Sequence, residues 1–122
     1  MDIMQAYIDG SELLTICNRP NIGQITNLPR DVIVETFVRK EKDGRVTPLP
    51  AGELPRPIHH ICYLHSSINE MVVEAALKGD RDLLVEAMSL DPSTGVMDFA
   101  HIPQLCDDLL HANRKWLPRF FD

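Results

Sequence analysis

The chain has 122 residues, of which 44% are hydrophobic and 25% are charged. That length and hydrophobic content are typical of one domain with one core, so we expect residues 1–122 to form a single folded domain. The formal net charge of −6 argues against a nucleic-acid or anionic-membrane partner, because both need a basic face on the protein.

The N-terminus and the cysteines predict the compartment. Asp2 stands where a signal peptide carries positive charge, and no apolar run approaches the length that spans a bilayer. We therefore expect a cytoplasmic protein with no membrane contact. Cys17, Cys62 and Cys106 are widely separated and lack the paired spacing of a zinc site. Buried thiols are the prediction for all three.

The first half of the chain predicts a small antiparallel sheet. Met1 to Ile8 are compatible with the end of a helix, with Gly10 placed for the left-handed conformation that follows a helix. Leu13 to Cys17 is an apolar run that favours a strand buried on both faces. Val32 to Arg39 alternates only in part, so one face should pack inward while its charged residues face solvent or pair.

A hairpin follows this second strand. Asp43-Gly44 favours a tight turn, and Arg45 to Leu49 would return antiparallel to the strand before it. Pro48 lacks a backbone donor, which predicts that the returning strand lies at the sheet edge. The proline-rich segment Pro50 to Pro57 should be an irregular connector.

The second half predicts about three helices. Apolar residues recur at helical spacing from Ile58 to Ala75, with Gly79 as the stop and Asp80 as the cap of a second helix that ends at Asp91-Pro92. A third regular helix should run from about Ile102. The fold class predicted is α+β, with a small antiparallel sheet packed with about three helices.

An ordered loop is predicted between the two long strands, from Asn18 to Glu35. Prolines that fix φ, a glycine that permits positive φ and asparagines that bond nearby backbone are concentrated there: Pro20, Pro29, Gly23, Asn18, Asn21 and Asn27. Asn18, Arg19 and Asn21 form its one polar cluster. We expect them to specify the loop or to line a substrate cleft.

The same stretch resembles the signature Asn-x-x-Asn-x-Gly-x-Ile-x-Asn-Leu-Pro-x-Asp-x-x-Val-Glu near the C-terminal end of family 4 glycoside hydrolases. The matching residues are Asn18, Asn21, Gly23, Ile25, Asn27, Leu28, Pro29, Asp31, Val34 and Glu35. Val72 to Asp82 and Trp116 to Phe120 resemble later stretches of that family, in the same order. Their register extends the resemblance over nearly the whole chain.

The resemblance implies that residues 1–122 are a truncated C-terminal domain, similar to part of the lactate-dehydrogenase-like C-terminal domain. For an intact member it implies NAD- and Mn2+-dependent hydrolysis of α-glycosides, closest to the α-glucosidase and α-galacturonidase branch. The family's catalytic, metal and NAD motifs would all precede the first residue here. No catalytic, cofactor-binding or metal residue is therefore assigned, and the chain alone is expected to bind neither cofactor.

The remaining titratable groups favour structural roles. His60 and His65 are five residues apart, which misses the i, i+4 geometry of a helical metal site. The carboxylate pairs Asp80/Asp82 and Asp107/Asp108 are better explained as a helix cap and a solvated face than as a glycosidase's acid and base.

Two functions from different classes follow. The first is the C-terminal part of a family 4 hydrolase, inactive alone, whose partner is a second copy of the chain or a missing N-terminal domain on another chain. The second is a stand-alone interaction module that self-associates through the surface such a domain would cover. Both predict exposed apolar surface, and a homo-oligomer is the expected state.

Overall fold

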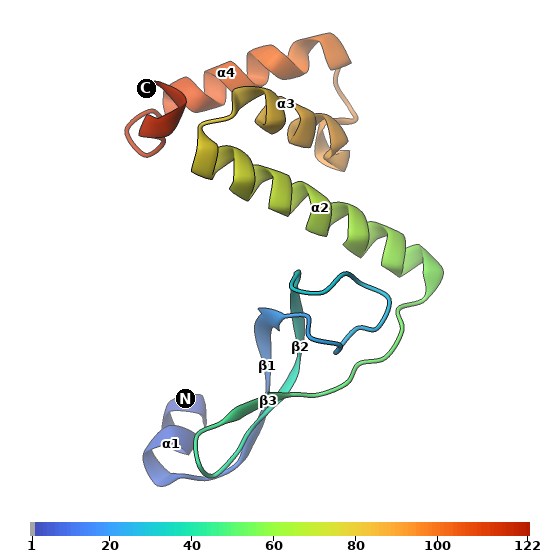
Figure 1. The fold of residues 1–122 in the computed structure, drawn as a ribbon, viewed down its shortest axis with the longest axis vertical. Helices are drawn as coiled ribbons and strands as arrows, with labels where there is room; N and C mark the ends of the chain where they lie inside the picture. Colours follow the sequence, from blue (N-terminus) through green and yellow to red (C-terminus); the bar gives the residue numbers. More distant parts are fainter. Residues whose placement is uncertain (1) are drawn as a thin grey trace. The chain divides into compact units, whose positions relative to one another are not determined.

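The computed structural model describes residues 2–122, and its helices and strands fall into two compact units. The first unit runs through Tyr63 and the second runs from Leu64 to Asp122. Helix α2 (Arg56–Lys78) crosses this boundary. Figure 1 shows the elements along the chain. Met1, the first residue of the segment predicted to end a helix, lies outside the described residues, and the single-domain interpretation stays a prediction.

The first unit is built on a three-stranded sheet in the order β1-β2-β3 (Figure 1), and the predicted antiparallel sheet is confirmed. Strand β1 (Leu13–Pro20) pairs with β2 (Ile33–Lys40), and β2 pairs with the short β3 (Val46–Pro48). Gly44 has φ of 85° in the turn between β2 and β3. The hairpin and the edge position of Pro48 are thus confirmed.

Strand β1 is not buried on both faces, so that prediction was wrong. Its residues alternate between half-buried and exposed, and Leu14 and Ile16 are 59% and 50% exposed. Strand β2 alternates strictly, with Val34 and Val38 inside. The apolar run misled because successive side chains of a strand point to opposite faces, and this sheet has its core on one face.

Lys40 is a charged residue on the buried face of β2, and it joins the sheet to helix α1 (Asp2–Asp9). Its Nζ donates to the Ala6 carbonyl at 2.6 Å and to the Ser11 carbonyl at 2.9 Å, and lies 5.1 Å from the centre of the Tyr7 ring. A cation near the carbonyl end of a helix is electrostatically favourable. Sequence reasoning missed this contact, because it depends on the fold.

The second unit contains the C-terminal part of α2, then α3 (Arg81–Leu90) and α4 (Ile102–Ala112). Gly79 ends α2 with φ of 72°, and the Asp80 carboxylate accepts a hydrogen bond from the Leu83 backbone NH, as predicted for a stop and a cap. The described part of the second unit also contains three short 3-10 helices: η1 (Pro92–Thr94), η2 (Phe99–His101) and η3 (Pro118–Phe120).

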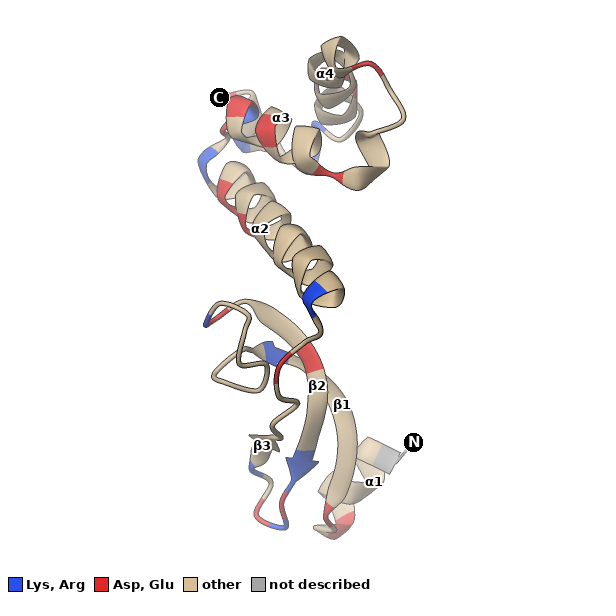
Figure 2. Cartoon of the chain, turned by 90° about the vertical axis from the view of Figure 1, so that its right-hand side faces the viewer, with Lys and Arg blue, Asp and Glu red and all other residues tan. Residues whose placement is uncertain are grey.

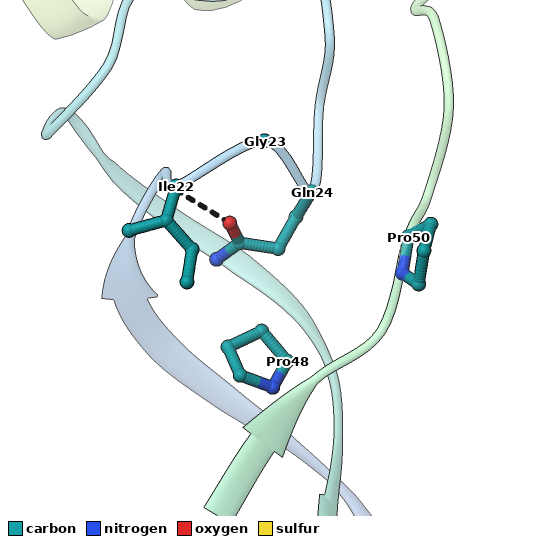
Figure 3. A pocket seen from close by; sticks show the side chains of 5 residues that line it. All are labelled: Ile22, Gly23, Gln24, Pro48 and Pro50. Atoms are coloured by element: carbon teal, nitrogen blue, oxygen red, sulfur yellow. Dashed lines mark hydrogen bonds between the residues drawn. The ribbon is translucent and has the colours of Figure 1, made fainter.

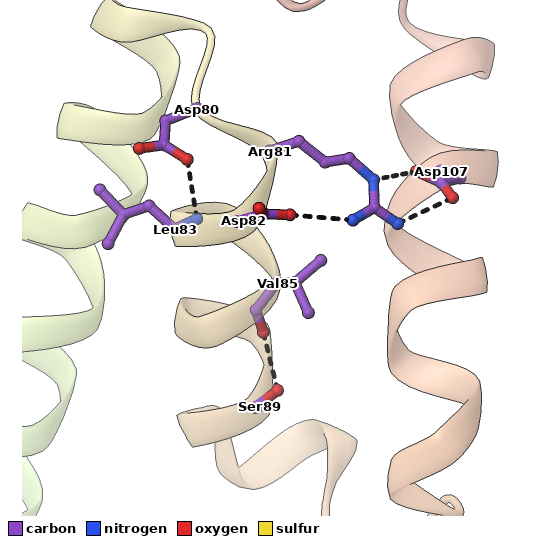
Figure 4. Close-up of polar contacts among 7 residues, drawn as sticks. All are labelled: Asp80, Arg81, Asp82, Leu83, Val85, Ser89 and Asp107. Atoms are coloured by element: carbon purple, nitrogen blue, oxygen red, sulfur yellow. Dashed lines mark hydrogen bonds and ion pairs between the residues drawn. The ribbon is translucent and has the colours of Figure 1, made fainter.

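An ion pair joins α3 to α4 in the second unit. The Arg81 guanidinium donates to both carboxylate oxygens of Asp107, at 2.6 and 2.9 Å, and at 3.2 Å to Asp82 (Figure 4). The sequence analysis explained Asp107 as part of a solvated face, but the side chain forms an ion pair with Arg81. The partner lies 26 residues away on another helix, so no local pattern could reveal it.

The fold is α+β, as predicted, and residues 2–122 contain a three-stranded sheet and four α-helices. Acidic and basic residues are interspersed along both units (Figure 2). Within residues 2–122, no helix has the length and apolar character needed to cross a membrane.

Candidate functional site

The loop between β1 and β2 is organised by one buried side chain. Asn21 is 1% exposed, and its Nδ2 lies within hydrogen-bond distance of three carbonyl oxygens, those of Ile25, Leu28 and Pro29, at 2.9 to 3.1 Å. Its Oδ1 accepts from the backbone NH of Gly23 and Ile25. We call residues 21–32 the asparagine loop.

Backbone bonds close the base of the asparagine loop. Asn21 NH donates to Val32 O at 2.8 Å, and Asp31 NH donates to Asn21 O at 2.9 Å. Asp31 has φ of 71°, a left-handed conformation that Asp and Asn tolerate better than most residues. Gly23 has φ of 125°, which in practice requires glycine. The signature residues Asn21, Gly23 and Asp31 thus have a structural reason to be what they are.

The loop is also bonded to the proline-rich connector. The Gln24 carbonyl accepts from Ala51 NH and Gly52 NH, and Thr26 NH donates to Gly52 O. The Asn27 amide pairs with both backbone groups of Leu54. These bonds fix the connector that leads into α2.

A small apolar core lies under the loop. Four buried residues pack together, and Leu54 and Cys62 pack against them: Ile25, Leu28, Val32 and Val34. Leu54 comes from the connector and Cys62 from the start of α2, within the first unit. The loop is therefore held both by its polar centre at Asn21 and by this core.

The structure separates the three predicted site residues. Asn18 and Arg19 continue strand β1, so the loop begins later than the sequence suggested, at Asn21. Asn18 is exposed while Arg19 is half-buried, and they alternate across the sheet. Asn21 faces its own loop. A role for the three in a substrate cleft stays a prediction.

A cleft of about 250 Å³ lies beside the asparagine loop, lined by Ile22, Gly23, Gln24, Pro48 and Pro50 (Figure 3). The Gln24 amide is bonded to the backbone around it. Its Oε1 accepts from Ile22 NH at 2.6 Å and its Nε2 donates to Pro20 O at 2.9 Å. The lining residues carry no titratable side chain, so the cleft by itself offers no acid, base or nucleophile.

The histidines and cysteines are spread over both units. The His59 and His60 rings on α2 lie edge to face, with their centroids 5.4 Å apart. Cys17, Cys62 and Cys106 are thiols, and of these three only Cys106 is fully buried. Burial raises the pKa of the Cys106 thiol. Among residues 2–122, no three side chains of His, Cys, Asp or Glu converge as metal ligands would.

The family model described as the family 4 glycosyl hydrolase C-terminal domain matches residues 1–94. The chain belongs to this family. The match includes the whole asparagine loop, β1, β2, β3, α2 and α3. The stretch that resembles the family signature therefore contains the asparagine loop, with Asn21 at its polar centre.

Curated family 4 relatives are similar over nearly all of the chain. The α-galacturonidase of Lachnoclostridium phytofermentans is 34% identical over 96% of the chain, and the α-galacturonidase of Bacillus subtilis is 36% identical over 92%. The α-galactosidase of Bacillus subtilis is 36% identical over 82%. The chain spans about a quarter of the length of these relatives, 25%, 25% and 23% respectively.

Solved structures agree in fold. A Bacillus subtilis protein described as a glucosidase, lplD, superposes with a TM-score of 0.82 at 36% identity, covering 89% of this chain and 25% of its own. The Thermotoga maritima 6-phospho-β-glucosidase, solved with manganese, NAD+ and glucose-6-phosphate, superposes with a TM-score of 0.81 at 24% identity, covering 95% and 29%. At that identity the second comparison bears on the fold alone.

Proposed function

We propose that this chain serves as the C-terminal part of a family 4 glycoside hydrolase that uses NAD and Mn2+ to cleave α-glycosides, and that it has no turnover alone. The observation that carries the proposal is the family match over residues 1–94. The asparagine loop supports it, because its polar groups bond their own backbone and so build a scaffold.

Among residues 2–122, the polar groups of the asparagine loop and of the cleft beside it do not fit either cofactor. The Asn21 amide and the Gln24 amide are engaged within the first unit, and no metal-ligand cluster forms among residues 2–122. In the proposed enzyme NAD and Mn2+ would be held by residues outside this chain. Its own contribution is to support the fold of such an enzyme through the asparagine loop, the connector and α2.

A non-phosphorylated α-galactoside or α-galacturonide is the proposed substrate class. Relatives named α-galacturonidase or α-galactosidase are 28 to 36% identical, and two named 6-phospho-β-glucosidase or probable 6-phospho-β-glucosidase are 26% and 29% identical. The highest of these identities support the α-glycosidase branch.

The test begins with the purified chain. Isothermal titration with NAD in the presence of Mn2+ should give no binding heat, and aryl α-galactosides and aryl α-galacturonides should not be turned over. The first three quarters of the Bacillus subtilis α-galacturonidase should also give no turnover alone and should gain turnover when co-expressed with this chain. Turnover by the chain alone would overturn the proposal.

A second candidate is a stand-alone module that self-associates. The observation that favours it is the exposed apolar face of the sheet, where Leu14, Ile16, Ile33 and Phe37 are 50 to 63% exposed. Exposed apolar patches commonly mark interaction surfaces. Failure of the co-expressed pair on every substrate, with the chain folded, would favour this candidate over the hydrolase.

A further inference from the structure

The outer face of the sheet presents an apolar pair between two opposite charges. On β2, Phe37 is 56% exposed, and Glu35 and Arg39 are exposed two residues before and after it. On β1, Ile16 lies directly beside Phe37 in the strand register and is 50% exposed. The order along β2 is therefore negative, aromatic, positive on a single face.

This order makes the face complementary to itself. Two copies can pack face to face about a two-fold axis that lies between the two sheets, perpendicular to the strands, at the level of Phe37. In that arrangement the two β2 strands run antiparallel. Glu35 of each copy then faces Arg39 of the other, because both lie the same two-residue distance, about 6.6 Å, from Phe37. A two-fold axis along the strands would instead bring Glu35 against Glu35, which like-charge repulsion disfavours.

We propose that the outer face of the β1-β2-β3 sheet is a homodimer interface, in which a second copy of this chain packs on Ile16 and Phe37 and pairs its Arg39 with Glu35. This inference does not depend on the glycosidase proposal. The charge pairs select the register, while the apolar pair supplies most of the attraction, since exposed ion pairs contribute little affinity.

The size of the face sets the strength of the contact. Strand β2 has eight residues, so at a rise of about 3.3 Å and a strand spacing of about 4.8 Å the face covers a few hundred Å². Stable interfaces bury about 800 Å² on each partner. The dimer is therefore reversible and forms with rising concentration.

Sedimentation equilibrium of the whole chain tests the proposal. From low to high micromolar concentration, the average mass should rise from that of one chain toward twice that value. Glu35→Arg and Arg39→Glu should each remain monomeric, because each places like charges at both contacts. An equimolar mixture of the two variants should dimerise again, since one copy then carries two Arg and the other two Glu.

Dimerisation of the mixed variants is the decisive result, because a structural role of either residue would not restore it. Lys42→Glu, a charge reversal in the neighbouring turn, should leave the association unchanged, and circular dichroism should show every variant folded. A wild-type chain that stays monomeric throughout would overturn the proposal. Association that neither charge reversal weakens would also overturn it, since another surface would then hold the copies together.

Discussion

Asn27 and Leu54 pair like neighbouring residues of a sheet, although one partner is a side chain. The Asn27 Nδ2 donates to the Leu54 carbonyl at 2.9 Å, and the Asn27 Oδ1 accepts from the Leu54 NH at 3.0 Å. The two residues are 27 positions apart. This pair ties the asparagine loop to the connector that enters α2, and both partners are half-buried.

Replacing Asn27 by Asp should destabilise the first unit by about 1 to 2 kcal/mol. The carboxylate keeps the shape of the amide and can still accept from Leu54 NH, but it cannot donate and it repels the Leu54 carbonyl. Urea unfolding measures the change. Asn69→Asp, an exposed position on α2, is the control and should stay near the wild type; equal effects at both sites would refute the role of the pair.

Asn21 should be the most sensitive residue of the asparagine loop. Asn21→Ala leaves the carbonyls of Ile25 and Leu28 without their donor in a buried site, which should cost about 3 kcal/mol or more. Asn21→Asp keeps the acceptor but places a buried carboxyl against three carbonyl oxygens, so we expect a loss at least as large. Chemical denaturation measures the free energy of unfolding of both variants. If Asn21→Ala lost no more stability than Asn69→Ala, the central role of Asn21 in the loop would be contradicted.

Local signals predicted most of the elements correctly. Gly79 with Asp80, and Asp43 with Gly44, mark a helix boundary and a turn through backbone preferences that act within a few residues. The antiparallel pairing of β2 with β3 followed from the short turn between them. These features needed no knowledge of the rest of the chain.

Features that depend on distant partners were missed or misplaced. The apolar run from Leu13 cannot by itself say how many faces of a sheet are covered. The burial of Lys40 depends on carbonyls that α1 places beside it. At the candidate site, the sequence identified Asn21 but assigned Asn18 and Arg19 to the loop, because nothing local marks where β1 ends.

Lys40→Met tests the contact between β2 and α1. Methionine fills a similar volume but donates no hydrogen bond, so the Ala6 and Ser11 carbonyls lose their partner, at a cost of about 1 to 3 kcal/mol. Thermal unfolding should show a lower midpoint. Lys42→Met, in the exposed turn, is the matched control, and a similar midpoint for both variants would mean that the buried ammonium adds no stability.

Gly79→Ala tests the close approach of the C-terminal segment to the end of α2. A Cβ at Gly79 would overlap the Arg119 carbonyl, and the φ of 72° is itself unfavourable for alanine. We expect a loss of about 2 to 4 kcal/mol. Gly52→Ala has a similar φ of 86° with nothing within 4 Å of the added atom, so it isolates the backbone strain at about 1 kcal/mol. Equal losses in thermal unfolding would exclude the overlap.

The Arg81 and Asp107 pair should make the second unit sensitive to acid. Arg81 holds the pKa of the Asp107 carboxyl below its ordinary value, mainly through the hydrogen bonds between them. A carboxyl with a lowered pKa in the folded state contributes stability above its unfolded pKa, about 3.9, and that contribution disappears as the pH falls through the folded pKa. Arg81 stays charged over this range, since the pair raises its pKa further.

Asp107→Asn should therefore lower the thermal midpoint at neutral pH, and the difference from the wild type should shrink toward zero as the pH falls below the folded pKa. Asp9 and Asp91 also have lowered pKa values, through bonds to Ser11 and Ser93. Both carboxyls are present in the wild type and in Asp107→Asn, so their effect on the pH dependence cancels when the two midpoints are subtracted. Asp108→Asn is the control and should shift the midpoint little at any pH. A difference for Asp107→Asn that does not change with pH would mean that the side chain acts through packing rather than through its charge.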